Sequence, residues 1–420
     1  MAEMRRSSVS LAQKTVRSIR LFGLLVAQLC AYSMLSALCF ACPLYLFDCS
    51  GSSTLYGAVA AIAFIPGVLA TPAGGILADR GRHRGVLVVL GIVLMAASLL
   101  FIPMKRSLPL AVVVAAMLCV QYGIQSLLKP MLQIETVRMT GPEKVERATA
   151  LVSQITMMSN ILGPVVGTAV YGCFGIDALC ETAALTFAMS ALLFGGALKQ
   201  NASSGMTGDS TTCSTCRSDF RESIRYLFQN ASLLVVFLLA AILNLALVGL
   251  TIGAPVIVAK HLGMQSSFVG IIEVAMGLGG LVGSGLVGIW PYRFSFKGIC
   301  RYVAMICFGV VPIIVTLLSG PDELAFAALA AGSAWVMAWA SIASVEIVSF
   351  VQRSAPKELC GKVLALVYMM LSCATPIGQL VYGLAYDRWA PAIVFAGMLA
   401  VLTLTTVQFY RLKSRLWQLS

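Results

Sequence analysis

The sequence predicts an all-α polytopic membrane protein with 12 transmembrane helices in two six-helix halves. The 420 residues are 59% hydrophobic and only 11% charged, with mean hydropathy +0.91, whereas soluble domains are about a quarter charged. The apolar residues form long runs without the polar–apolar alternation of a membrane β-barrel. Basic residues collect in alternate loops, as the positive-inside rule requires.

A helix needs about 20 apolar residues to cross the roughly 30 Å hydrocarbon layer. The chain supplies 12 runs of this length, with short connections between most of them. The predicted spans are residues 21–47, 54–78, 86–104, 108–131, 148–174, 179–198, 233–259, 268–290, 299–318, 324–348, 363–386 and 391–410.

The first half, residues 21–198, follows a basic, Ser-rich cytoplasmic segment at residues 1–20. We find no cleavable signal peptide, because the first apolar run is long enough to span and many others follow it. The second and third spans are joined by one acid and three arginines within residues 79–84. So short a basic turn predicts a helical hairpin whose turn faces the cytoplasm.

A long polar insert at residues 199–230 separates the halves and predicts a cytoplasmic loop, with a short amphipathic helix at 221–230. Its Cys213 and Cys216 have CxxC spacing but no partner pair, so we interpret them as incidental; a metal or redox role is the alternative. The second half, residues 231–410, is followed by a cytoplasmic tail at 411–420.

The distribution of the 29 Lys and Arg residues fixes the predicted orientation. Lys129 lies inside a span, and the opposite side carries only Lys105, Arg106, Lys260 and Arg388; all others lie in the termini or near loops that follow even-numbered spans. Both termini are therefore predicted to be cytoplasmic, in a multi-pass plasma-membrane protein. The net charge of +12 follows from this topology, so we do not predict a nucleic-acid partner.

The two halves resemble each other. Residues 167–172 and 378–383 share Gly, Val and Tyr-Gly at matching positions, and Glu135 and Glu346 have the same separation of half the chain. Duplicated halves are typical of secondary transporters. The sequence contains no Walker-type phosphate loop and no catalytic constellation, so we predict neither an enzyme nor a bound cofactor.

The turn between spans two and three resembles the Gly-x-x-x-Asp-Arg-x-Gly-Arg-Arg signature of the major facilitator superfamily. The matching residues are Gly75, Asp79, Arg80 and Arg84, while Arg82 and His83 depart from the pattern. The resemblance implies that Asp79 faces the start of span 11 and stabilises one conformational state. Arg80 and Arg84 would pair with nearby acids; alternatively, the arginines only set topology.

Span five carries a second resemblance. Gly163, Pro164 and Gly167 match the Gly-x-x-x-Gly-Pro-x-x-Gly-Gly antiporter motif, although Ser159 and Thr168 replace the outer glycines. The family implies a seal that differs between states, and close helix packing is the compatible alternative. Further positions follow the macrolide-efflux-like, drug:proton antiporter branch: Tyr122-Gly123, Pro130, Pro142-Glu143, residues 147–151 and residues 225–227.

Glu273 is the clearest charge at membrane depth, and such charges are costly and usually functional. It is our candidate for proton coupling; an acid in a water-filled vestibule is the alternative. Mid-span amide and aromatic side chains suit an amphiphilic ligand. The candidates for the substrate cavity are Gln28, Tyr32, Gln121, Tyr122, Gln125, Asn160, Asn244, Trp335, Trp339 and Tyr368.

We therefore predict a monomeric secondary transporter that works by alternating access. The predicted activity is efflux of an amphiphilic drug-like compound or metabolite, driven by the proton gradient. One alternative is a lysophospholipid or lipid flippase of the same fold. Another is a membrane sensor or partner protein without transport activity, with residues 199–220 as its interaction segment.

Overall fold

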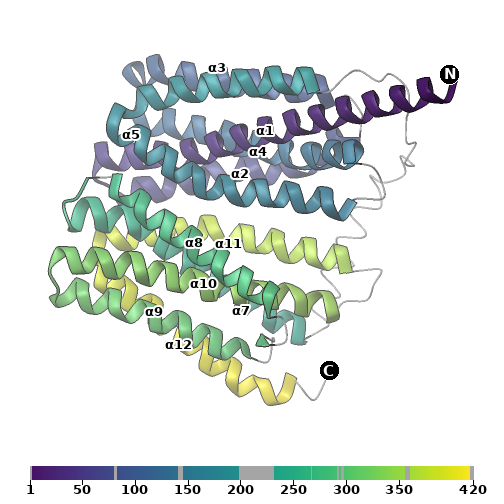
Figure 1. Ribbon diagram of the computed structural model, residues 1–420. Helices are drawn as coiled ribbons and strands as arrows, with labels where there is room; N and C mark the ends of the chain where they lie inside the picture. Colours follow the sequence, from purple (N-terminus) through teal and green to yellow (C-terminus); the bar gives the residue numbers. More distant parts are fainter. Residues whose placement is uncertain are drawn as a thin grey trace. The chain divides into compact units, whose positions relative to one another are not determined.

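The computed structural model describes residues 2–79, 83–140, 145–197, 231–265, 267–290, 293–294, 298–354 and 360–416. Within these residues every regular element is helical, as predicted (Figure 1). The first helices are α1 Ala2–Ser50, α2 Ser53–Asp79, α3 His83–Ser107, α4 Leu110–Thr140 and α5 Val145–Ala197. The later ones are α7 Ala231–Val256, the π-helix η2 Ile257–His261, α8 Ser267–Ile289, α9 Ile299–Ser319, α10 Asp322–Ser354, α11 Cys360–Arg388 and α12 Pro391–Leu416.

Two glycines turn the chain where the sequence predicts span ends. Gly51 has φ 64° between α1 and α2. Gly175, with φ 82° and ψ 175°, bends α5 between predicted spans five and six. Glycine enters such conformations without the steric cost that a Cβ imposes. The two predicted spans are therefore one bent element without an intervening loop.

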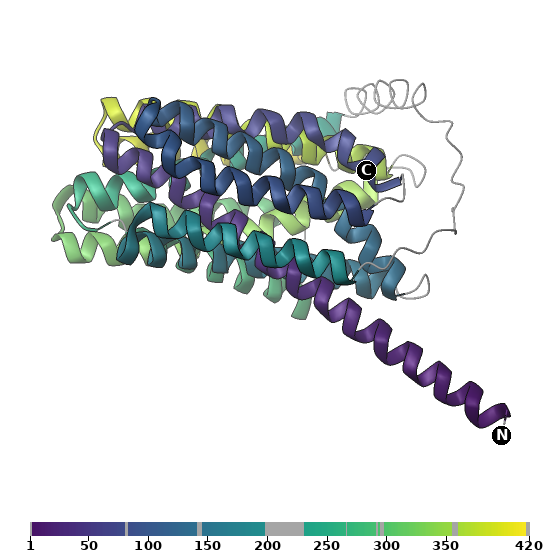
Figure 2. The same cartoon turned by 90° about the horizontal axis from the view of Figure 1, so that it is seen from above.

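Several helices are longer than the predicted spans. α1 begins at Ala2, since residues 2–20 contain neither Gly nor Pro to interrupt the helix. In Figure 2 this part of α1 extends beyond the neighbouring helices. Helices α4, α10 and α12 also continue past the predicted spans, to Thr140, Ser354 and Leu416. The predicted spans follow the apolar residues, whereas the helical backbone continues into polar sequence.

The chain divides into two compact units, 1–46 with 62–206 and 47–61 with 207–420. In the first unit, α3 packs against α4 and α5 around buried residues such as Phe187 and Phe194. In the second, α10 packs against α8 and α9, α9 against α12, and α7 against α11. Residues 47–61, the last turn of α1 and the first turns of α2, thus group with the second unit.

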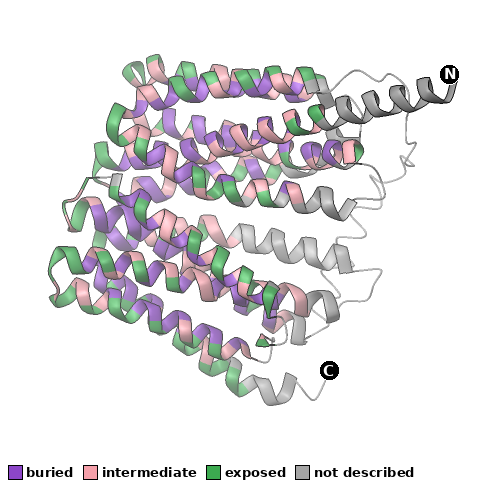
Figure 3. Ribbon diagram, viewed as in Figure 1, coloured by how far each residue is buried: buried purple, intermediate pink, exposed green. Residues whose placement is uncertain are grey.

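The outward faces of many helices are apolar. Leu69, Leu192 and Phe308 are 73%, 77% and 65% exposed, and exposed residues alternate with buried ones along the helices in Figure 3. Ten helical stretches in the described part are long and apolar enough to cross a membrane. One of them, Gln154–Gly196, contains the bend at Gly175. The protein is a multi-pass membrane protein; the number of 12 crossings stays a prediction.

Candidate functional site

The predicted cytoplasmic hairpin lies between α2 and α3. Gly75 and Asp79 are in the last turns of α2, and Arg84 is in the first turn of α3. Arg80 and the side chains of residues 71–84 lie outside those that the structure describes. Helix α2 ends at Asp79 and α3 begins at His83, close to the predicted span ends, while the gating role of these residues stays a prediction.

The antiporter-like motif of α5 lies directly against α1. A Cβ at Gly167 would lie 2.8 Å from the carbonyl oxygen of Ala37, and one at Gly163 would overlap Ser36. Pro164 is buried between the two glycines and leaves one helical N–H···O bond unformed. The glycines of the motif therefore let α5 approach both the backbone and a side chain of α1 closely, within the first unit.

A polar stripe runs along α1 and reaches α4 at Cys39. Gln28 and Tyr32 are one turn apart, and farther along Cys39 Sγ donates to Gln121 Oε1 at 3.2 Å. Gln28 and Gln121 are fully buried, and Tyr32 is 3% exposed. Among described protein groups, both amide atoms of Gln28, Tyr32 Oη and Gln121 Nε2 have no hydrogen-bond partner. Buried polar atoms are normally paired, so these four atoms are exceptions in the described part of the chain.

The other first-unit candidates differ in environment. Tyr122 packs its ring on Phe64, with centroids 5.0 Å apart. Gln125 is half-buried one turn from Gln121, whereas Asn160 is exposed on α5. Gln28, Tyr32 and Gln121 are therefore buried, on α1 and α4, whereas Asn160 is exposed.

In the second unit Asn244 joins α7 to α11, because its Nδ2 donates to Thr375 Oγ1 at 3.3 Å. Nearby, Tyr386 Oη donates to the carbonyl of Gly249 at 2.9 Å. Gly249 and Gly253 admit the rings of Tyr382 and Tyr386. In the first unit glycines on α5 admit α1; in the second, glycines on α7 admit α11.

The two candidate tryptophans lie in an aromatic row that joins α9 to α10. Trp335 and Trp339 have ring centroids 6.1 Å apart, and Trp339 stacks on Tyr302 at 5.9 Å. Trp335 Nε1 donates to the carbonyl of Met305 at 2.9 Å, and the residue is 42% exposed. These contacts join a different helix pair from those of Asn244. The side chain of Tyr368 lies outside the described residues.

Glu273 is half-buried in the second turn of α8. It interacts electrostatically with Tyr56, which is 7% exposed. The ring of Tyr56 in turn meets Phe47 edge-on, with centroids 6.1 Å apart. Phe47 and Tyr56 both belong to the segment 47–61, so the electrostatic interaction of Glu273 is with this segment.

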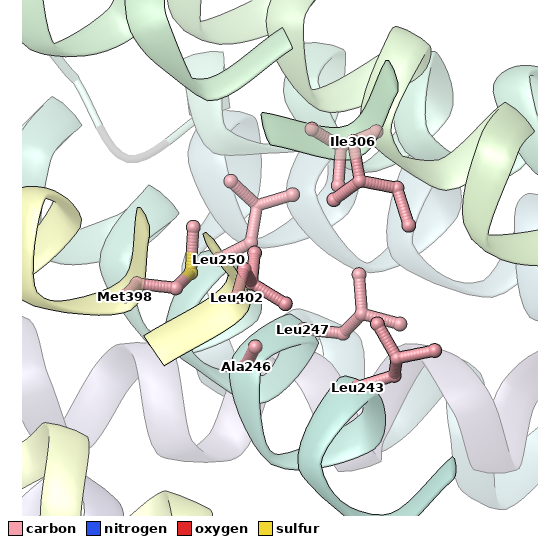
Figure 4. A pocket seen from close by; sticks show the side chains of 8 residues that line it. Leu243, Ala246, Leu247, Leu250, Ile306, Met398 and Leu402 are labelled. Atoms are coloured by element: carbon pink, nitrogen blue, oxygen red, sulfur yellow. The ribbon is translucent and has the colours of Figure 1, made fainter. Parts of the chain in front are cut away.

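A small apolar pocket lies among α7, α9, α10 and α12 (Figure 4). Its interior of about 10 Å³ is comparable to the space that one water molecule needs. Its wall is formed by Leu243, Ala246, Leu247, Leu250, Ile306, Val336, Met398 and Leu402. So small and apolar a pocket is a packing gap and offers no site for a drug-sized ligand.

A polar cluster at the first turn of α2 is absent from the predicted site residues. We name it the outer cap cluster; its members are Ser52, Ser53, Thr54, Lys260 and Asp387. The carboxylate of Asp387 accepts hydrogen bonds from the backbone N–H groups of Ser53 at 2.9 Å and Thr54 at 2.7 Å. It also accepts one from Ser52 Oγ at 3.0 Å. Lys260 Nζ lies 3.4 Å from Asp387 Oδ1 and 3.4 Å from the carbonyl of Gly51.

Together these contacts satisfy the first turn of α2. The first N–H groups of a helix lack intrahelical acceptors, and here two go to Asp387. The third, of Leu55, donates to Ser52 Oγ at 3.2 Å. Partial burial of Asp387 raises its pKa, but the hydrogen bonds from Thr54, Ser53 and Ser52 outweigh this and hold the pKa well below its usual range. The carboxylate is therefore ionised at neutral pH.

Part of the cluster has a sequence signal. Ser52 precedes the second apolar run, a normal position for a helix N-cap, and Asp387 follows the eleventh run. Nothing in the sequence pairs them, because 335 positions separate Ser52 from Asp387.

These features define a multi-pass helical membrane protein with close glycine contacts between its helices. The family model described as Major Facilitator Superfamily matches residues 24–378, and the chain belongs to that family. It is a secondary transporter of small molecules in a lipid bilayer. Macrolide efflux protein A from Streptococcus pyogenes is 20% identical over 346 residues, which cover 82% of this chain and 84% of that protein. The predicted resemblance to the superfamily is confirmed.

Solved transporters have the same fold. The nucleoside transporter NupG gives a TM-score of 0.73 at 14% identity, covering 93% of this chain and 98% of that one. A bacterial homologue of the human lysosomal transporter Spinster gives 0.71 at 12% identity, covering 95% and 97%. A bacterial homologue of the iron transporter ferroportin gives 0.70 at 14% identity, covering 93% and 98%. At these identities the likeness concerns the fold alone.

Proposed function

We propose that this protein exports an amphiphilic compound of the macrolide kind across the plasma membrane, in exchange for protons. The likeness to Macrolide efflux protein A extends over 82% of the chain and is not confined to one motif. It supports both the direction of transport and the substrate class.

The polar stripe of α1 and α4 supports the proposed substrate class. Gln28, Tyr32 and Gln121 are buried, yet four of their polar atoms lack partners in the described protein. Burying such atoms without hydrogen bonds is unfavourable. A ligand with hydroxyl and ester oxygens on an apolar frame would pair with them and also contact the apolar helix faces.

The coupling side of the proposal depends on Glu273. It is a carboxylate in the membrane-length helical stretch Phe268–Val287, where an ionised side chain is costly. Binding a proton would remove this charge from the membrane. Proton uptake and release at Glu273 would then alternate with substrate binding and release.

Purified protein in proteoliposomes, acidic inside, tests the proposal with radiolabelled erythromycin. The wild type should accumulate the label as protons leave, and collapsing the gradient should abolish accumulation. Glu273→Gln should lose gradient-driven uptake, whereas the control Glu323→Gln, an exposed acid in the first turn of α10, should retain it. Uptake that ignores the gradient would refute the coupling. Translocation of lysophospholipid without macrolide uptake would favour the flippase.

A further inference from the structure

The outer cap cluster joins two helix ends that are far apart in the chain. We propose that it is a conformational latch: Asp387 holds the first turn of α2 against α11 in one state of the transport cycle and releases it in the other. This inference rests on the proposed function only in assigning the latch to a transport cycle. The equilibrium between the two states exists in the protein without substrate.

The path of the chain supports this inference. Helices α1 and α2 belong mainly to the first unit, yet residues 47–61 group with the second. The chain passes between the units at residues 46–47 and 61–62. Any change in the relation between the units therefore acts on this segment. Contacts from η2 and α11 hold the segment in place.

The backbones of α2 and α11 are in direct contact beside the cap. A Cβ at Gly383 would lie 2.7 Å from the carbonyl oxygen of Ser53 and 3.2 Å from Gly57 Cα. A Cβ at Gly57 would lie 3.1 Å from Gly383 Cα. Two glycines meet here without interlocking side chains, so the helices can separate without disrupting a packed core.

The polar contacts of the outer cap cluster can break and re-form. The Asp387 side chain is 23% exposed and that of Lys260 is 50% exposed, so water can replace each hydrogen bond when the helices part. A carboxylate at a helix N-terminus also interacts favourably with the helix dipole. Such a contact, present in one state only, shifts the equilibrium between states by its own free energy.

The position of Asp387 mirrors that predicted for Asp79. Asp387 lies at the C-terminal end of α11 and contacts the start of α2. Asp79 is the last residue of α2 and is predicted to face the start of α11. The same helix pair thus carries an acid at each end, and the two acids would favour opposite states.

Hydrogen–deuterium exchange of the full-length protein in nanodiscs, without substrate, tests the latch. Asp387→Ala should raise exchange of peptides covering residues 52–55 by about tenfold. It should also lower exchange of peptides covering residues 79–85, because the predicted inner contact gains population. The matched control Asp322→Ala, an exposed acid in the first turn of α10, should change neither peptide.

Faster exchange at residues 52–55 without a change at residues 79–85 would mean that Asp387 is only a local helix cap, and would overturn the latch. No change at either end would overturn it as well. If Asp387→Ala does not fold, Gly383→Ala, which keeps all charges but inserts a Cβ between α2 and α11, should give the same reciprocal pattern. The exchange experiment contains no macrolide, so failure of the erythromycin assay would not affect the latch. Equally, failure of the exchange experiment would not affect the proposed macrolide export.

Discussion

The carboxylate of Asp387 accepts a hydrogen bond from the backbone N–H of Thr54 at 2.7 Å, across 333 positions of sequence. It connects the end of α11 with the first turn of α2. The acid thereby does for α2 what a local N-cap side chain usually does. It links two helices with eight described elements between them in the chain.

Replacing this acid should destabilise the protein measurably. Asp387→Ala removes the acceptor for two backbone N–H groups and one hydroxyl, and loss of a helix cap costs about 0.5–2 kcal/mol. We expect a lower midpoint of thermal unfolding in detergent, followed by intrinsic fluorescence. Asp322→Ala is the control: it removes an exposed acid from the first turn of α10 and should lower the midpoint less. Equal midpoints for both variants would contradict the cap.

The cap should be insensitive to pH across the physiological range. The hydrogen bonds lower the pKa of Asp387 in the folded protein, so its stabilisation is present above the ordinary carboxyl pKa of about 4. It is lost only as the pH falls through the lowered folded value. The exchange ratio between Asp387→Ala and wild type at residues 52–55 should therefore be constant from pH 8 to 5. A ratio that falls within this range would contradict an ionised cap.

The contact between α5 and α1 should not tolerate a side chain at Gly167. The added Cβ of Gly167→Ala would lie 2.8 Å from the Ala37 carbonyl oxygen, and overpacking costs about 1–3 kcal/mol. Gly196→Ala, on the same helix with no atom within 4 Å of its Cβ, should be neutral or stabilising. Thermal unfolding midpoints compare the two, and equal effects would contradict the close contact.

Gln28→Met should weaken ligand binding without lowering the stability of the protein. It removes two buried polar atoms without partners in the described protein and keeps a similar volume, so stability should stay equal or rise by about 1 kcal/mol. Erythromycin affinity, measured by equilibrium dialysis, should fall by about tenfold, the equivalent of one hydrogen bond of about 1.4 kcal/mol. Gln408→Met, at an exposed position of α12, should alter neither quantity. Unchanged affinity in Gln28→Met would remove this residue from the site.

Asp79→Asn should shift the conformational equilibrium without altering which compounds bind. The loss of its charge weakens the predicted contact with the start of α11, so peptides covering residues 79–85 should exchange faster and those covering 52–55 more slowly. This is the reverse of Asp387→Ala. A changed ligand profile, with unchanged exchange at both ends, would place Asp79 in binding instead of gating.

The sequence predicts what depends on local composition. The length of the apolar runs predicts where α2 ends, at Asp79, and where α3 begins, at His83. The bend in α5 lies at Gly175, because glycine adopts a positive φ easily. The direction of a side chain on an apolar helix does not, because all faces of such a helix are hydrophobic. Trp335 and Asn160 were candidates by depth alone, and the structure places both at exposed positions. The Asp387–Thr54 contact depends on tertiary packing and has no periodic signal.

Substrate-evoked proton movement tests the central claim, proton-coupled macrolide export, most directly. Proteoliposomes that contain a trapped pH-sensitive dye, without an imposed gradient, receive erythromycin from outside. We predict that substrate entry drives protons out and makes the lumen alkaline, that Glu323→Gln responds like the wild type, and that Glu273→Gln gives no signal. Entry of radiolabelled erythromycin without any change in luminal pH would contradict the claim.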